Sequence, residues 1–63
     1  MAEETVYTRT TRRAIEAAGG EAALARAVGA NVEEVRDWLA ARAVPPDKTF
    51  LVLLEIVSRR RPV

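Results

Sequence analysis

Apolar residues recur at intervals of three and four along most of the chain, a spacing that places them on one face of an α-helix. The pattern predicts helices over about 8–18, 21–28, 32–42 and 46–60. The first seven residues lack it and are expected to be frayed. A short strand over 5–11 is the alternative there, because β-branched residues alternate along that stretch. The prediction is an all-α domain of four short helices.

Glycine and asparagine residues mark the ends of the predicted helices. Gly19 and Gly20 are expected to end the first helix and Gly29 the second, because glycine adopts left-handed backbone angles without a steric penalty. Asn31 is a suitable N-cap for the third helix, with Glu34 in the partner position of a capping box. Residues 29–31 are therefore predicted to form a tight turn between two helices.

Each predicted helix has its own set of core-facing residues. Trp38 is expected to be a core anchor rather than a platform for base stacking, because it shares a helical face with Val35. Pro45 is expected to end the third helix, and Pro46 or Asp47 to begin the fourth. The expected core residues are Ile15, with Thr11 and Ala18, then Leu24, Val28, Val32, Val35, Trp38, Leu39, Phe50, Leu53, Leu54 and Val57.

The spacing of Ala25, Gly29, Val35 and Trp38 is typical of a helix-turn-helix, here over about 21–42. The segment 17–45 resembles small Cro-type and phage-repressor-like regulators, in particular the YdaS-like antitoxin family. The matching residues are Ala17, Ala18, Gly19, Gly20, Ala22, Ala23, Leu24, Ala25, Ala27, Gly29, Val35, Trp38, Leu39, Arg42 and Pro45. The resemblance implies a lambda repressor/Cro-like domain in a bacterial or phage regulator that binds double-stranded DNA.

The solvent-facing side of the third helix would then be the reading surface. The candidate base contacts are Asn31, Glu33, Arg36, Asp37 and Ala40, and the candidate phosphate contacts are Thr10, Thr11, Arg12, Arg13, Arg26 and Arg42. Glu33, Glu34 and Asp37 oppose binding to a polyanion, although the first two also favour the helix dipole. The alternative is a protein-interaction module whose acidic third helix or apolar fourth helix binds a partner such as a cognate toxin.

The fourth predicted helix is apolar beyond the width of a normal core-facing stripe. Leu51, Val52 and Ile56 widen it, so we expect them to form a homodimer interface, with simple exposure of a few aliphatic side chains as the alternative. A chain of 63 residues forms one domain at most and buries a small core, which also favours pairing.

Composition argues against several other functions. The chain has no cysteine and no histidine, so thiolate metal sites and the commonest general base are missing. The nine carboxylates fall on predicted solvent faces, and we expect no enzyme activity, cofactor or metal. The apolar stretch 50–57 is far shorter than the ~20 residues that span a bilayer, so a cytoplasmic protein is expected.

Overall fold

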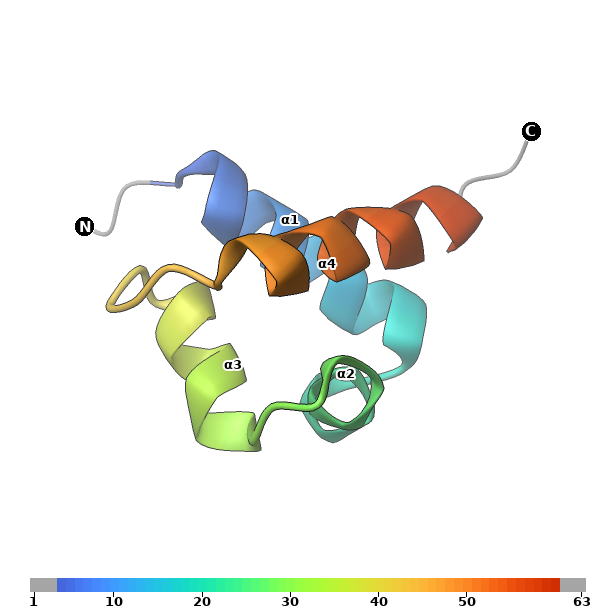
Figure 1. Ribbon diagram of the computed structural model, residues 1–63, viewed down its shortest axis with the longest axis horizontal. Helices are drawn as coiled ribbons and strands as arrows, with labels where there is room; N and C mark the ends of the chain where they lie inside the picture. The colour runs from blue at the N-terminus through green and yellow to red at the C-terminus, as the bar shows by residue number, and fades with distance from the viewer. Residues whose placement is uncertain (1–3, 61–63) are drawn as a thin grey trace.

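The structure, a computed structural model, describes residues 4–60 and contains four helices and no strand within that range. They are α1 (Val6–Ala18), α2 (Glu21–Val28), α3 (Val32–Leu39) and α4 (Asp47–Arg60) (Figure 1). The all-α prediction is confirmed, as are the bounds predicted for 21–28. The fraying expected of residues 1–3 lies outside the described residues.

The first helix begins at Val6, two residues earlier than predicted, because Thr5 caps it. The Thr5 hydroxyl accepts a hydrogen bond from the Thr8 backbone N–H at 3.2 Å, and the Thr8 hydroxyl accepts one from the Thr5 N–H at 2.8 Å. This is a capping box with threonine in the place usually taken by Glu or Gln. The expectation that residues 5–7 are frayed was wrong, and so was the alternative of a strand.

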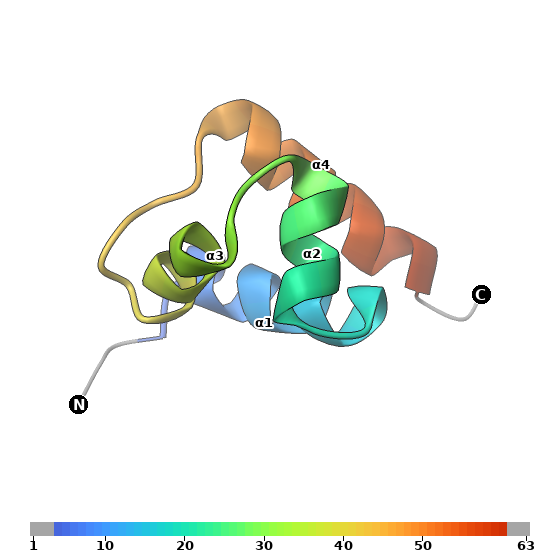
Figure 2. The ribbon, with the colours of Figure 1, turned by 90° about the horizontal axis from the view of Figure 1, so that it is seen from below.

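The core lies where α1 packs against each of the other three helices. Figure 2 shows α2 and α3 on the near side, with α4 behind them. The predicted anchor Ile15 is only half-buried, whereas Ala14 is fully buried, because a small side chain allows closer approach of neighbouring helices. The buried apolar residues of this core are Ala14, Leu24, Ala25, Val35, Trp38 and Leu53.

The turn between α2 and α3 has the chemistry predicted for it. Gly29 has φ 75°, and the N–H groups of Gly29 and Ala30 both donate to the Ala25 carbonyl. Asn31 Oδ1 accepts from the Glu34 N–H at 2.8 Å, and Glu34 Oε1 accepts from the Asn31 N–H at 3.0 Å. Three residues, 29–31, thus join two helices that run in clearly different directions (Figure 1).

The third helix ends at Leu39, three residues earlier than predicted. The Arg42 N–H donates to the Asp37 carbonyl at 2.9 Å and the Ala41 N–H to the Trp38 carbonyl at 3.2 Å. These two bonds form a Schellman motif, and Ala41 takes its left-handed position with φ 63°. Ala40 and Arg42 therefore lie beyond the helix.

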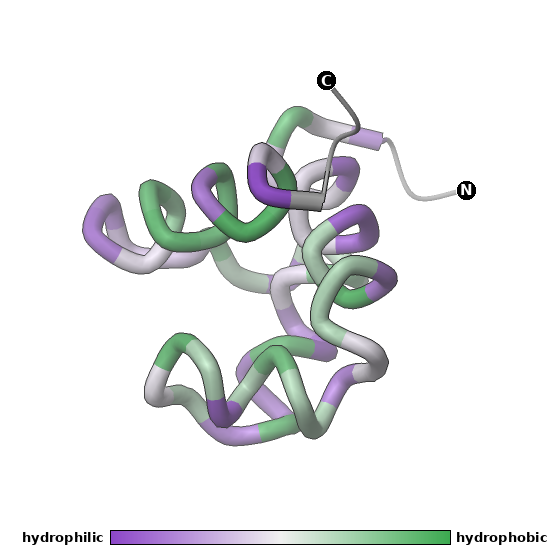
Figure 3. The backbone as a smooth tube through the Cα atoms, turned by 90° about the vertical axis from the view of Figure 1, so that its right-hand side faces the viewer, coloured by the Kyte–Doolittle hydropathy of each residue, from purple (hydrophilic) through white to green (hydrophobic). Residues whose placement is uncertain are grey.

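The last helix begins at Asp47, one of the two predicted starts, and packs on α1 through the Tyr7 and Phe50 rings. Their centroids are 5.0 Å apart in an edge-to-face arrangement. Figure 3 shows hydrophobic residues along much of α4, which ends at the C-terminal trace. Leu53 is buried as predicted, but Leu54 is 42% exposed and is not a core residue. Ile56, predicted to contact a second copy, packs against the core of its own chain.

No helix in the described part of the chain combines the length and the apolar character needed to cross a membrane.

Candidate nucleic-acid interface

The solvent-facing side of α3 carries a group of charged side chains, which we call the α3 face: Glu33, Arg36 and Asp37, with Arg42 beside them. Together these four residues line one open surface depression. Val35 and Trp38 point the other way into the core, so the helix cannot rotate without exposing them. The fold thus fixes which side of α3 meets the solvent.

Arg36, the one cation within α3, is held by a neighbouring helix. Its Nε donates to Glu21 Oε1 at 3.0 Å, and Glu21 is the first residue of α2. Because both side chains are partly exposed, the pair contributes at most about 1 kcal/mol to stability. Its larger consequence is local, since it partly neutralises the guanidinium that would approach a base or a phosphate.

Asp37 is paired in a similar way, with Arg42. The distance from Arg42 Nε to Asp37 Oδ1 is 3.5 Å. The turn at Ala41 makes this possible, because it brings the chain back toward the last turn of α3. A bridge by Arg36 between Glu33 and Asp37, which would offset their like charges, is not found, because Arg36 turns to Glu21 instead.

The remaining candidates for base contact differ in what they can offer. Asn31 uses Oδ1 in the helix cap, so its side-chain NH₂ is the group left to donate. Glu33 is exposed and has no ion pair within the part of the chain that the structure describes. Ala40 is exposed just beyond the end of α3.

Two of the predicted phosphate contacts were wrong. Thr10 is 7% exposed and Thr11 is fully buried, and the Thr11 hydroxyl donates to the Tyr7 carbonyl at 2.7 Å, so neither side chain is open enough to contact a phosphate. Periodicity placed Thr11 correctly on the core side. Thr10 lies beside it because α1 is covered by three helices and buries more than one stripe.

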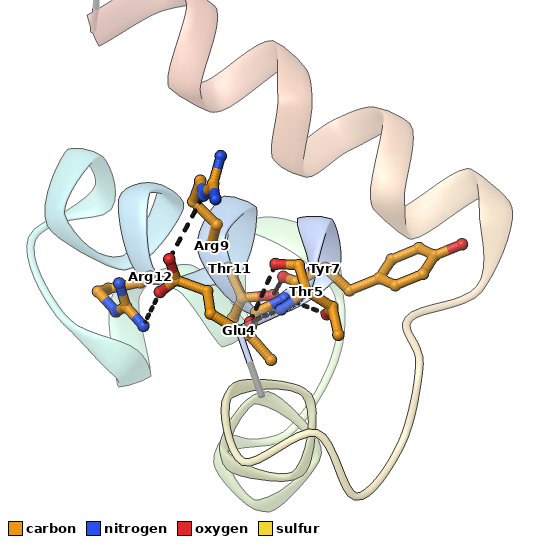
Figure 4. A network of polar contacts seen from close by, with 7 residues as sticks. Glu4, Thr5, Tyr7, Arg9, Thr11 and Arg12 are labelled. Atoms are coloured by element: carbon orange, nitrogen blue, oxygen red, sulfur yellow. Dashed lines mark hydrogen bonds and ion pairs between the residues drawn. The ribbon is translucent and has the colours of Figure 1, made fainter. Parts of the chain in front are cut away.

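Two of the three arginines of α1 form a separate group around Glu4, drawn in Figure 4. Arg12 and Arg9 both pair with the Glu4 carboxylate. The hydrogen bond from Arg12, aided by Arg9, holds the pKa of Glu4 below its usual value. Arg13 on α1 and Arg26 on α2 are exposed. The structure therefore brings Arg36 and Arg42 together and leaves the other candidate phosphate contacts on other helices.

Charge dominates what the α3 face can do chemically. The carboxylates of Glu33 and Asp37 on this face, with that of Glu21 beside it, outnumber the guanidinium groups of Arg36 and Arg42. Glu21 was not foreseen as part of this surface. Among residues 4–60, no group of three acidic side chains is arranged to hold a metal ion. The face is thus suited to recognising a partner by charge and hydrogen bonding.

Comparison of the chain with models of protein families, with curated proteins and with solved structures finds no match.

Proposed function

We propose that this chain is a DNA-binding transcriptional regulator of the Cro-like helix-turn-helix type, with α3 as its recognition helix. The observation that carries the proposal is the rigid mounting of α3. A three-residue turn and a capping box fix its start, and two buried side chains fix its rotation. Helices joined in this way commonly place the second helix in the DNA major groove.

The exposed groups on α3 have partners among the base edges of the major groove. A guanidinium such as that of Arg36 donates two hydrogen bonds to guanine, and a carboxylate such as that of Glu33 accepts one from the cytosine amino group. The methyl group of Ala40 suits contact with the thymine methyl. Arg42, Arg26, Arg13 and Arg12 remain as donors to phosphates.

The ion pairs on the α3 face set the conditions for binding. To bind a base, the Arg36 side chain must give up its ion pair with Glu21. To bind a phosphate, the Arg42 guanidinium must contact it while it lies beside Asp37. The carboxylates that remain repel the DNA backbone, which supplies most of the sequence-independent affinity. We therefore expect weak binding to arbitrary DNA and a marked preference for duplexes that satisfy Arg36 and Glu33.

Selection from a pool of duplexes with a random central segment tests this proposal. The pool is enriched on the protein at low salt, and the affinity of the enriched duplexes is then titrated by fluorescence anisotropy. The proposal predicts an enriched sequence containing G·C pairs and an affinity that falls steeply with salt. A pool that stays random, with no binding to any duplex at low salt, would refute it.

A second function, docking of a basic protein partner, is favoured by the excess of carboxylates on the α3 face. The double substitution E33K/D37K separates the two functions. On a DNA-binding surface it removes two repulsive charges and adds two attractive ones, so affinity for arbitrary duplex rises. On an acidic docking surface, such as one for a cognate toxin, it removes the attraction and abolishes binding of the partner.

A further inference from the structure

One side of α4 is apolar and faces the solvent. Leu51 is 65% exposed and Leu54 is 42% exposed, whereas Leu53 between them is fully buried against the other helices. Residues three apart on a helix are neighbours on its surface, so Leu51 and Leu54 form one apolar strip. Lys48 and Glu55 flank it and are exposed as well. We call these four residues the α4 outer stripe.

The charges of the α4 outer stripe are arranged so that it complements itself. Lys48 lies near the start of α4 and has no ion pair within residues 4–60. Glu55 lies seven residues further on, where it pairs with Arg59 of the same helix at 3.4 Å in an exposed contact, so a lysine of a second copy would share this carboxylate with Arg59. Within one helix that separation is about 10 Å, too far for a direct pair. Two such stripes laid antiparallel bring Lys48 of each copy toward Glu55 of the other. In a parallel arrangement Lys48 of each copy would lie at the level of Lys48 of the other, about 10 Å along the helix from Glu55, so the opposite charges would not meet.

We propose that two copies of this chain pair through the α4 outer stripe, with the two α4 helices antiparallel about a two-fold axis. Leu51 of one copy then packs against Leu54 of the second copy, and each contact occurs twice by symmetry. The occupant of the stripe is thus a second copy rather than an unrelated partner. Between two copies the leucines pack against leucines, and each lysine meets a glutamate. The pairing is independent of DNA binding.

The small size of the stripe implies a weak dimer that depends on concentration. Sedimentation velocity and equilibrium from low to high micromolar concentration therefore test the proposal. We expect the average mass to rise from that of one chain toward that of two. L51K, which alters a widely exposed side chain, should keep the chain monomeric over the same range. Circular dichroism should confirm that this variant keeps its helical content.

A charge exchange tests the antiparallel arrangement itself. K48E and E55K should each weaken the dimer, by roughly 3- to 10-fold for two repulsive pairs of exposed charges. The double variant K48E/E55K should restore the dissociation constant of the unaltered chain. Rescue of this kind needs contact between copies, since the two positions are too far apart within one helix.

Three results would overturn the proposal. A chain that stays monomeric at the highest concentration has no such pairing. A dimer that survives L51K uses another surface. A double charge variant as weak as the single variants shows that Lys48 and Glu55 do not meet across the interface.

Discussion

Exchanging glycine and alanine at two equivalent positions gives opposite changes in stability if the end of α3 is as described. Gly29 and Ala41 each follow a helix, have left-handed φ angles of 75° and 63°, and occupy the same position of the closing turn. Glycine at position 29 suits the left-handed conformation, whereas alanine at position 41 does not. The pair A41G and G29A therefore isolates the backbone conformation.

The size of the change in the free energy of unfolding follows from two opposing contributions. An alanine in the left-handed region costs about 1–2 kcal/mol relative to a relaxed conformation. Glycine removes that cost, but it raises the conformational entropy of the unfolded chain by about 0.4–1 kcal/mol. A41G should therefore stabilise the domain by about 0.5–1 kcal/mol, which is a rise in Tm of roughly 2–8 °C for a domain of this size. G29A should destabilise it by a similar amount, because a Cβ at Gly29 meets no atom within 4 Å and adds backbone strain alone.

Urea unfolding followed by circular dichroism, at a concentration low enough to keep the chain monomeric, gives both free energies of unfolding. Ala43→Gly is the matched control, because Ala43 lies in the same connection without a positive φ. It should leave the stability unchanged or lower it slightly. If A41G lowered the stability as much as G29A does, Ala41 would have ordinary helical angles and α3 would continue to Arg42, as the sequence pattern alone predicts.

Three further predictions concern the core and the helix ends. L53A should lower the free energy of unfolding in urea by about 2–5 kcal/mol, because Leu53 is fully buried. L54A should lower it by about 1 kcal/mol or less, because Leu54 is 42% exposed. Equal losses of stability would contradict the orientation of α4. T5A should lower the stability by about 1 kcal/mol through loss of the α1 cap, with the exposed Val6→Ala as control. The pKa of Glu4 is lowered in the folded state, so the stability that this carboxylate contributes is present above its ordinary pKa of 4.5 and is lost as the pH falls below that value. E4Q should make the decline of Tm with acid shallower, and an unchanged decline would show that Glu4 is unpaired in solution.

Local chemistry made the turn between α2 and α3 predictable from sequence. Glycine at position 29 and the Asn31–Glu34 spacing act on backbone groups within a few residues, and both are found as expected. The Thr5–Thr8 box was missed although it is equally local. Its second member is a threonine, which is uncommon at that position of a capping box.

The end of α3 was not predictable from the pattern, because no glycine marks it. Ala40, Ala41 and Arg42 all favour helix by intrinsic propensity. The chain nevertheless turns at Ala41 and leads to Pro45, which is buried. Tertiary packing thus overrides local preference there, and the strain at Ala41 is the result.

The candidate site was predicted only in part, because one of its ion pairs depends on how two helices cross. Helical periodicity placed Glu33, Arg36 and Asp37 on one face of α3, and all three lie there. It could not identify Glu21 as the partner of Arg36, because the two are 15 residues apart and meet only through the crossing of α2 and α3. The charge available on the α3 face therefore becomes known only from the fold.

The central claim, that α3 reads DNA, is tested most directly by the affinity of R36A for the duplex enriched from the random pool. Its matched control is R59A, which removes the same charge from an exposed position on α4. If Arg36 contacts a base, R36A should bind roughly 10-fold or more weakly than the unaltered chain, whereas R59A should change the affinity by a small factor. Equal affinities of R36A and R59A for that duplex would contradict the account.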